Sequence, residues 1–178
     1  RLISRDRVGK EDVVRVVDEI LSSVRARGDE ALLEYTRRFD RVELDAASMR
    51  VSEQEMKEAY DLLDPEMLEV IRRSKANIES FHEKQKENSW FSTQDDGVLL
   101  GQLYRPLEIV GIYVPGGTAV LTSTVLMNGL PAKVAGVERI IMATPPGKDG
   151  SIDPGVLVAA QEAGVTEIYK MGGAQAVA

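Results

Sequence analysis

Short apolar segments alternate with longer helical patterns in the second half of the chain, and this alternation constrains the fold most strongly. Strands are expected at Ile109–Val114, Arg139–Thr144 and Glu167–Met171, with helices between them at Ser123–Ala135 and Pro154–Ala163. The order strand, helix, strand, helix, strand predicts a parallel sheet. Each crossover helix returns the chain to the end of the sheet where the previous strand began, so that the next strand runs in the same direction. The predicted fold class is therefore α/β. The continuous apolar strands predict a sheet that is covered on both faces.

Residues 1–96 have a different composition from residues 97–178. The first region contains 17 Lys and Arg, 23 Asp and Glu and 2 Gly, whereas the second contains 5, 6 and 13. Charged residues with few glycines are typical of solvated amphipathic helices, and glycine turns are typical of buried sheets. We therefore expect an N-terminal helical region at 1–96 and an α/β half-domain at 97–178, which is truncated at its C-terminal end.

Four helices are expected in the first region. Apolar residues recur on one face of Lys10–Arg27, Gly28 suits its C-terminal cap, and Asp29–Phe39 continues as a second helix. Ser52 and Glu55 have the spacing of a capping box and mark the start of a third helix. A long fourth helix follows from the Asp64-Pro65 pair to near Asn88. Its charged residues are expected to form a solvated face.

The segment between the long helix and the sheet contains a turn and a further strand. Asp95-Asp96-Gly97 marks the turn, and Val98–Tyr104 has the pattern of a strand. We expect this strand to form a hairpin with Ile109–Val114 around Arg105-Pro106. Trp90 and Phe91 are expected to anchor the long helix against the sheet.

The composition excludes several classes of protein. The absence of cysteine excludes disulfides and thiolate metal sites and favours a cytoplasmic protein. No apolar run approaches the length of a membrane span, and Arg1–Arg5 contains no signal-peptide core. The net charge of −7 without a basic stripe argues against a nucleic-acid partner.

Two glycine turns follow two of the expected strands. Pro115-Gly116-Gly117 ends the first apolar run, and Gly172-Gly173 comes after the last strand, just before Gln175. Such turns present backbone N–H groups to anionic ligands, and turns after parallel strands meet at the carboxyl edge of the sheet. The first turn lacks the Gly-x-Gly-x-x-Gly pattern and the lysine of a P-loop. An ordinary tight turn therefore remains the alternative to a cofactor site.

No catalytic residue or metal ligand is predicted from the residues alone. Thr118, Thr122, Ser123 and Thr124 are expected to cap a helix rather than to bind a ligand. His82 is the only histidine and is expected to be structural. No serine, lysine or carboxylate has an evident base partner for nucleophilic or acid–base chemistry.

The glycine turns and the segments around them resemble the histidinol dehydrogenase family over nearly the whole chain. The resemblance is carried by Gly111-Ile112-Tyr113-Val114-Pro115-Gly116-Gly117-Thr118-Ala119, Ser123-Thr124-Val125-Leu126-Met127-Asn128, Pro131-Ala132-Lys133-Val134-Ala135-Gly136-Val137 and Gly172-Gly173-Ala174-Gln175-Ala176-Val177-Ala178. Segments Arg25–Leu32 and Asn77–Gln85 also match the family. Together these motifs are highly specific.

The resemblance implies an enzyme that oxidises L-histidinol to L-histidine with NAD and zinc, in histidine biosynthesis. Tyr113 and Gln175 correspond to residues that contact NAD. The zinc ligands and the catalytic residues are expected outside this chain segment, so that the fragment alone is expected to be inactive. The family also implies an intertwined homodimer and incomplete Rossmann-like domains, as in aldehyde dehydrogenases. The alternative is a stand-alone nucleotide-binding or dimerisation module without catalysis.

Overall fold

A three-stranded parallel sheet forms the centre of the computed structural model, which describes residues 7–116 and 120–178, with side chains from residue 12 onward. The strand order is β3 (Ile109–Tyr113), β4 (Arg139–Thr144) and β5 (Glu167–Lys170). Helices α5 (Thr122–Ala135) and α6 (Pro154–Ala163) connect the strands. The predicted α/β alternation with a parallel sheet is therefore confirmed.

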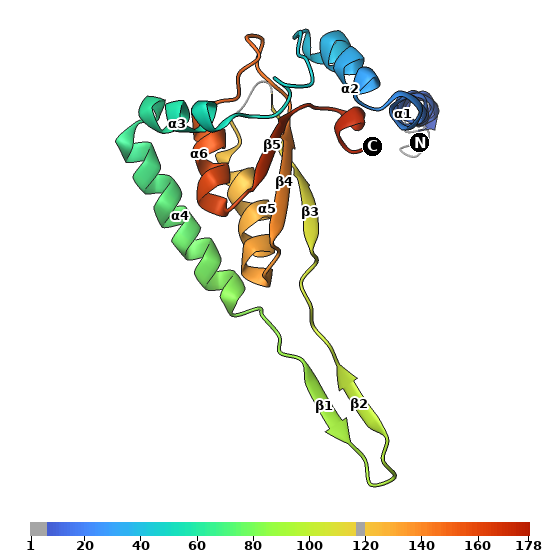
Figure 1. Ribbon diagram of the computed structural model, residues 1–178, viewed down its shortest axis with the longest axis vertical. Coiled ribbons are helices and arrows are strands. Elements are labelled where there is room, and N and C mark those ends of the chain that lie inside the picture. Colours follow the sequence, from blue (N-terminus) through green and yellow to red (C-terminus); the bar gives the residue numbers. More distant parts are fainter. Residues whose placement is uncertain (1–6, 117–119) are drawn as a thin grey trace, which may run out of the picture.

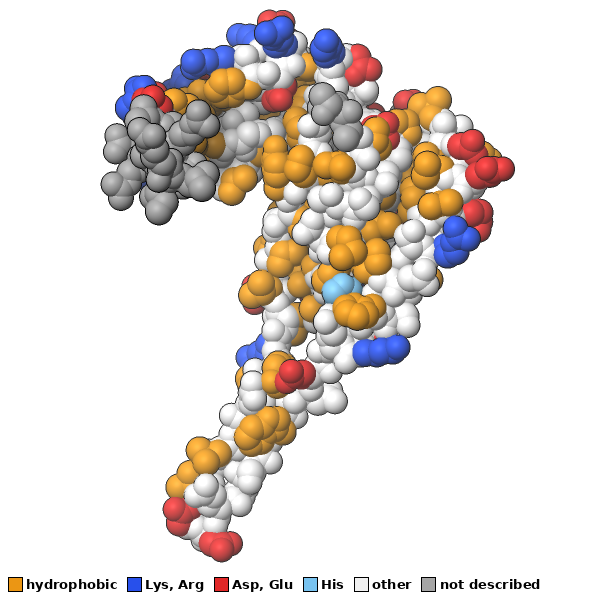
Figure 2. Space-filling model, turned by 180° about the vertical axis from the view of Figure 1, so that it is seen from behind, with side chains coloured by type: hydrophobic (Ala, Val, Ile, Leu, Met, Phe, Trp, Pro, Cys, Tyr) orange, Lys and Arg blue, Asp and Glu red, His pale blue; other side chains and the backbone are white. Residues whose placement is uncertain are grey.

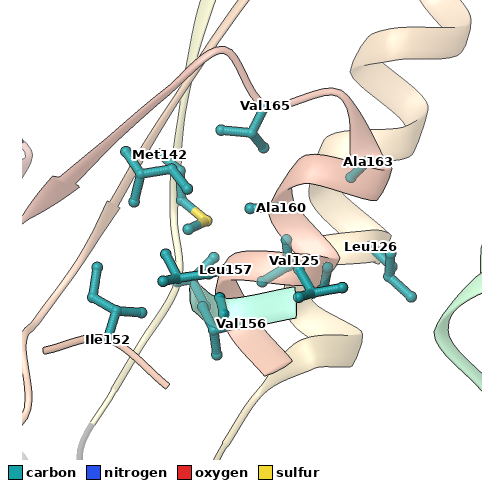
Figure 3. Packing of buried hydrophobic residues seen from close by; sticks show 14 of the residues in the cluster. Val125, Leu126, Met142, Ile152, Val156, Leu157, Ala160, Ala163 and Val165 are labelled. Carbon is teal, nitrogen blue, oxygen red and sulfur yellow. The ribbon is translucent and has the colours of Figure 1, made fainter. Parts of the chain in front are cut away.

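The remaining helices of the main body form an outer layer. Helices α3 (Glu53–Leu62) and α4 (Pro65–Glu83) lie on the outer side of α5 and α6, which separate them from the sheet (Figure 1). The main hydrophobic core lies between these layers. Figure 3 shows Met142 of the sheet near Leu157 and Ala160 of α6 and Val125 of α5. The helical layers therefore support the sheet from one side.

The predicted caps of α3 and α4 are confirmed. The N–H of Glu55 donates to Oγ of Ser52 at 3.2 Å, and the carboxylate of Glu55 accepts from the Ser52 N–H at 2.9 Å. Oδ1 of Asp64 accepts from the Glu66 N–H at 2.8 Å, with Pro65 as the first helical residue. These contacts satisfy N–H groups that have no partner within a helix.

The N-terminal helices pack beside the C-terminal end of the chain. Helix α1 (Arg7–Arg27) ends just before Gly28, as predicted. Gly28 has a positive φ of 57°, and its N–H donates to the Val24 carbonyl at 2.8 Å. The expected second helix has a different course, because α2 (Asp29–Tyr35) changes into a π-helical turn, η1 (Thr36–Asp40). Both α1 and α2 contact the short 3₁₀ helix η2 (Ala174–Ala176), as Figure 1 shows.

The predicted hairpin is wrong in its pairing. The strand at Leu99–Gln102 (β2) pairs antiparallel with β1 (Trp90–Thr93), whereas β3 pairs only with β4 among the described strands. The turn lies at the Asp95-Asp96-Gly97 sequence, where Gly97 has a φ of 84°. Its backbone is closed by the Gln94 N–H donating to the Val98 carbonyl at 2.8 Å. Glycine permits this left-handed conformation, which the Arg105-Pro106 pair does not offer.

The expected anchoring role of Trp90 and Phe91 is also wrong. The hairpin projects away from the body (Figure 1). Both aromatic side chains are exposed, by 53% and 62%. Hydrophobic side chains gather along this arm in Figure 2. The two strands of the arm pack mainly against each other rather than against the sheet. The reason is that the chain runs beyond the end of α4 before it turns back.

The expectation that both faces of the sheet are covered is wrong for the described chain. Val110 and Ile112 are half-buried, on the side of β3 that faces the helices. Ile109 and Tyr113 alternate with them and are 49% and 37% exposed. The apolar run of β3 was therefore a poor guide to burial, since one face lacks a covering layer in the part of the chain that the structure describes.

Glu162 joins the helical layers through a group of polar contacts. Its carboxylate lies on α6 and accepts hydrogen bonds from Nε of Arg72 and Nζ of Lys75, both at 3.1 Å. The Tyr60 hydroxyl donates to the same carboxylate at 3.4 Å. Burial by itself raises the pKa of Glu162, but the hydrogen bonds from Lys75 and Arg72 outweigh it and lower this pKa.

We expect Glu162→Gln to lower the free energy of unfolding at pH 7 by about 1–3 kcal/mol, because the charged hydrogen bonds are lost and half-exposed Arg72 is partly screened. A lowered folded pKa means that this contribution is present above the unfolded value and is lost as pH falls through the folded value. Urea unfolding at pH 7 and at pH 3 should therefore show a difference that shrinks in acid. Exposed Glu58→Gln is the control, and an equal effect of both variants would contradict the prediction.

Candidate functional site

The two predicted turns lie at the same edge of the sheet. Pro115 and Gly116 follow β3, and Gly172 and Gly173 follow β5. Gly117 and Thr118 lie outside the described residues. The carboxyl ends of parallel strands share one edge, where ligands bind in folds of this class. The structure therefore brings the two turns together as the spacing predicts.

Pro145 is the contact that both turns share. A Cβ atom added to Gly116 would lie 2.8 Å from Cγ of Pro145, and one added to Gly172 would lie 2.6 Å from its Cβ. Glycine is required at both positions because the turns pack closely against this proline. Close packing thus explains these two glycines without a ligand. For Gly116 and Gly172, ordinary tight turns therefore remain an alternative to a cofactor site.

Tyr113 connects the two turns directly. It is the last residue of β3, and its hydroxyl oxygen accepts a hydrogen bond from the N–H of Gly173 at 3.1 Å. The hydroxyl keeps its own proton to donate elsewhere. The ring remains 37% exposed on the uncovered face of the sheet. Tyr113 is thus accessible to a ligand while it holds the second turn.

Gln175 has an amide group without a hydrogen-bond partner. The residue is only 2% exposed, and neither Oε1 nor Nε2 has a partner among the described residues. Its side chain folds back over Gly173, where an added Cβ would lie 2.6 Å from Oε1. A buried amide that makes no hydrogen bond costs free energy. Such a group is a reason to expect a ligand or a further segment with hydroxyl or amide groups at this point.

An open cleft of about 320 Å³ lies at the same edge, toward the start of α6. It is lined by Gly116, Val120, Thr144, Ser151, Asp153 and Val156, among others. Neither Tyr113 nor Gln175 lines this cleft. The two predicted site residues are therefore close to each other but do not belong to this cleft.

The expected capping by hydroxyl side chains is wrong for α5. The N-cap position is occupied by Leu121, and no side chain among the described residues caps the helix by a hydrogen bond. Because α5 begins at Thr122, the hydroxyls of Thr122, Ser123 and Thr124 lie inside its first turn rather than before it. Thr118 is outside the described residues.

Metal binding finds no support in the described residues. Nδ1 of His82 lies 2.6 Å from Oε1 of Gln85, a local contact at the end of α4. The part of the chain that the structure describes holds no group of three or more His, Cys, Asp or Glu suited to a metal. Within that same part, no helix is long and apolar enough to cross a membrane.

The sequence alone did not indicate the roles of two further residues. One lies at this edge of the sheet, and the other lies at the end of η1. Pro145 lies in the loop after β4, and its packing against both glycine turns depends on contacts between segments far apart in the chain. Asp40 ends η1, and its Oδ2 is buried without a partner among the described residues, so that burial raises its pKa. No local pattern marks either role.

Comparison with known proteins identifies the same family throughout. The family model described as histidinol dehydrogenase matches residues 3–178. A histidinol dehydrogenase from Geobacillus kaustophilus is 57% identical over 96% of this chain and 40% of its own length. One from Heliobacterium mobile is 60% identical over 91% of this chain and 38% of its own length.

A solved structure gives the same result. The crystal structure of histidinol dehydrogenase from Elizabethkingia anophelis superposes with a TM-score of 0.87 and is 40% identical in sequence. The match covers 93% of this chain and 38% of that one. The chain spans about 40% of the length of the curated relatives that it matches. Since the family model covers almost every residue, this chain belongs to the histidinol dehydrogenase family.

Proposed function

We propose that this chain is the N-terminal part of a cytoplasmic histidinol dehydrogenase, which oxidises L-histidinol to L-histidine with NAD and zinc. The observation that carries the proposal is the family match over residues 3–178, at 57% identity to one relative. When bound, NAD supplies the acceptor for the hydride that leaves the substrate. The part played by this chain is to bind and orient that cofactor.

Tyr113 and Gln175 are the residues that we propose for contact with NAD. The buried amide of Gln175 can both donate to and accept from a ribose hydroxyl, and it has no competing partner among the described residues. The exposed ring of Tyr113 offers a flat apolar surface at the same edge. We further propose that region 97–178 is an incomplete Rossmann-like unit of the aldehyde-dehydrogenase type. The N-terminal region, which is helical as far as Glu83, would end at residue 96.

The described residues do not fit a zinc site, because they hold no group of suitable ligands. We therefore propose that the zinc ligands and the catalytic residues come from elsewhere in the complete enzyme. No chemical step is assigned to this chain through the metal.

The isolated 178-residue chain is expected to produce no NADH from L-histidinol and to bind zinc without a defined stoichiometry, whereas the complete enzyme should do both. Calorimetric titration with zinc and NADH absorbance test the two statements on the same preparations. Binding of one equivalent of zinc by the isolated chain with micromolar affinity would contradict the assignment of the ligands. A complete enzyme that forms no NADH from L-histidinol would contradict the proposed function.

We also propose that the protein forms a homodimer in which the hairpin of β1 and β2 contacts a second copy. Every residue of the two strands is exposed, and Phe91 and Leu99 are each 62% exposed on one face. A two-stranded hairpin is marginally stable in water, and exposed apolar side chains on an open edge favour association. Burial of these side chains by a second chain would therefore stabilise the arm.

The double variant Phe91→Ser, Leu99→Ser is expected to shift the protein from dimer to monomer, because it removes the apolar side chains of one face of the arm. Light scattering at several concentrations measures the change. Leu62→Ser is the matched control, since Leu62 is 73% exposed on α3 and lies outside the arm. A parent protein that remains a dilute monomer and binds no hydrophobic dye would contradict the proposal.

A further inference from the structure

Tyr113 and Gly173 are joined by a hydrogen bond although β4 lies between their strands. Tyr113 of β3 is paired with Ala143 of β4, which is in turn paired with Tyr169 of β5. Residues in one such row point to the same face of a sheet. The small side chain of Ala143 leaves room for the ring of Tyr113 to extend across β4. The hydroxyl thereby reaches the turn that follows β5, at 3.1 Å.

The turn that Tyr113 reaches determines where the amide of Gln175 lies. Gly173 has φ 64° and ψ −165°, a conformation that residues with a side chain rarely adopt. Its missing side chain is the space that the Gln175 amide occupies, since an added Cβ would lie 2.6 Å from Oε1. The position of the amide therefore depends on the backbone of Gly173.

The N–H of Gly173 is held by no other group in the described chain than Tyr113. Gly172 is buried against Pro145, so the turn is fixed by packing on one side and by this hydrogen bond on the other. A glycine has more backbone freedom than any other residue. Loss of the bond would therefore release the flexible half of the turn, next to Gln175.

We propose that Tyr113 is a positioning residue, whose hydroxyl oxygen holds the Gly173 N–H and thereby sets the orientation of the Gln175 amide. The inference rests on the proposed function, because it assigns to Tyr113 a role through Gln175 in the same cofactor site. It separates two roles of one side chain: the ring faces outward, and the hydroxyl oxygen fixes the loop.

Hydrogen exchange tests the hydrogen bond between Gly173 and Tyr113 without any measurement of activity. In the complete enzyme, Tyr113→Phe keeps the ring and removes the acceptor, so that the peptide containing Gly173 should exchange faster, by about two- to twelve-fold if the bond has the usual net worth of a neutral hydrogen bond. Tyr169→Phe is the matched control, because its hydroxyl donates to Glu167 at 2.9 Å instead. Unchanged exchange of the Gly173 peptide in Tyr113→Phe would overturn the proposal.

A double-mutant cycle tests the coupling to Gln175. Tyr113→Phe should raise KM for NAD by about two- to twelve-fold in the parent enzyme, with little change in kcat. In a Gln175→Ala background the same substitution should have little further effect, because the proposed role of the hydroxyl is to position the amide that is then absent. Equal effects in both backgrounds would show that Tyr113 acts alone and would overturn the proposal.

Failure of the proposed function gives a different result. If Gln175→Ala alone leaves the NAD dependence of the complete enzyme unchanged, the cofactor assignment is wrong, and Tyr113 has no effect on NAD binding through Gln175. Faster exchange of the Gly173 peptide in Tyr113→Phe would in that case still support the hydrogen bond between the two loops. The two failures are therefore distinguishable on one set of variants.

Discussion

Gln175→Met should stabilise the protein in the absence of NAD and at the same time weaken its binding of NAD. Met has a similar length and no amide, so that it fills the buried space without a group that needs hydrogen bonds. Relief of a buried unpartnered amide is expected to raise the free energy of unfolding by about 1–3 kcal/mol. The gain in stability arises from the same group that we propose for cofactor binding.

The loss of NAD affinity follows from the hydrogen bonds that the amide would make with the cofactor. The substitution removes one or two hydrogen bonds to neutral ribose hydroxyls, each worth about 0.5–1.5 kcal/mol net. KM for NAD should therefore rise by roughly three- to a hundred-fold, with zinc content unchanged. Gln175→Ala should raise it by a similar factor but gain less stability, because it leaves a cavity. Tyr113→Ala should also raise KM for NAD, because it removes both the ring and the hydrogen bond to Gly173.

Denaturant unfolding without cofactor and steady-state kinetics of the complete enzyme measure the two effects. The control is Gln161→Met, an exposed glutamine on α6, for which stability should stay within about 0.5 kcal/mol and KM should not change. If Gln175→Met destabilises the protein and leaves KM for NAD as it was, Gln175 is a structural residue. Opposite signs for stability and affinity are therefore the result that identifies a binding residue.

The elements that the sequence predicted well have strong local signals. Helix α6 begins after Asp153, its N-cap, with Pro154 as the first helical residue. It ends at the C-cap Gly164, which has the left-handed conformation usual for a glycine at this position, with a φ of 82°. The capping box of Ser52 and Glu55 likewise fixed the start of α3. In each case the residues that stop or start the element are adjacent to it in the chain. Their effect does not depend on the rest of the fold.

The hairpin arm was mispredicted because strand pairing is not a local property. Val98–Tyr104 and Ile109–Val114 both have strand character, and their proximity in the chain favoured pairing between them. The alternative partner, Trp90–Thr93, has the better turn, with Gly97 in a left-handed conformation. β3 could then pair with β4, a parallel partner supplied by the crossover through α5. Competition between partners decided the topology.

The candidate site was predictable only in outline. Two glycine turns after two strands indicated a common edge, and the resemblance selected Tyr113 and Gln175. The hydrogen bond from Gly173 to Tyr113 joins residues 60 positions apart and appears in no local pattern. The burial of Gln175 likewise depends on η2 packing against α1 and α2, from the other end of the chain. Contacts between distant segments therefore account for what the sequence left open.

Leu130→Ala should lower the free energy of unfolding by about 2–5 kcal/mol, the largest loss of stability that we expect from one substitution. Leu130 lies on α5, is fully buried and belongs to the core between the helices and the sheet. Its neighbour Gly129 faces Ala163 of α6 so closely that an added Cβ would lie 3.0 Å from the Ala163 Cβ. Because the two helices already touch there, α5 has little room to move inward and fill the cavity. The loss should therefore lie in the upper part of the range.

Urea unfolding with an unchanged slope measures this loss. Met127→Ala is the matched control, since Met127 lies on the same helix, is 55% exposed and should change stability by no more than about 0.5 kcal/mol. Leu130→Met preserves volume and should cost less than about 1.5 kcal/mol. If Leu130→Ala costs no more than Met127→Ala, α5 does not pack as described.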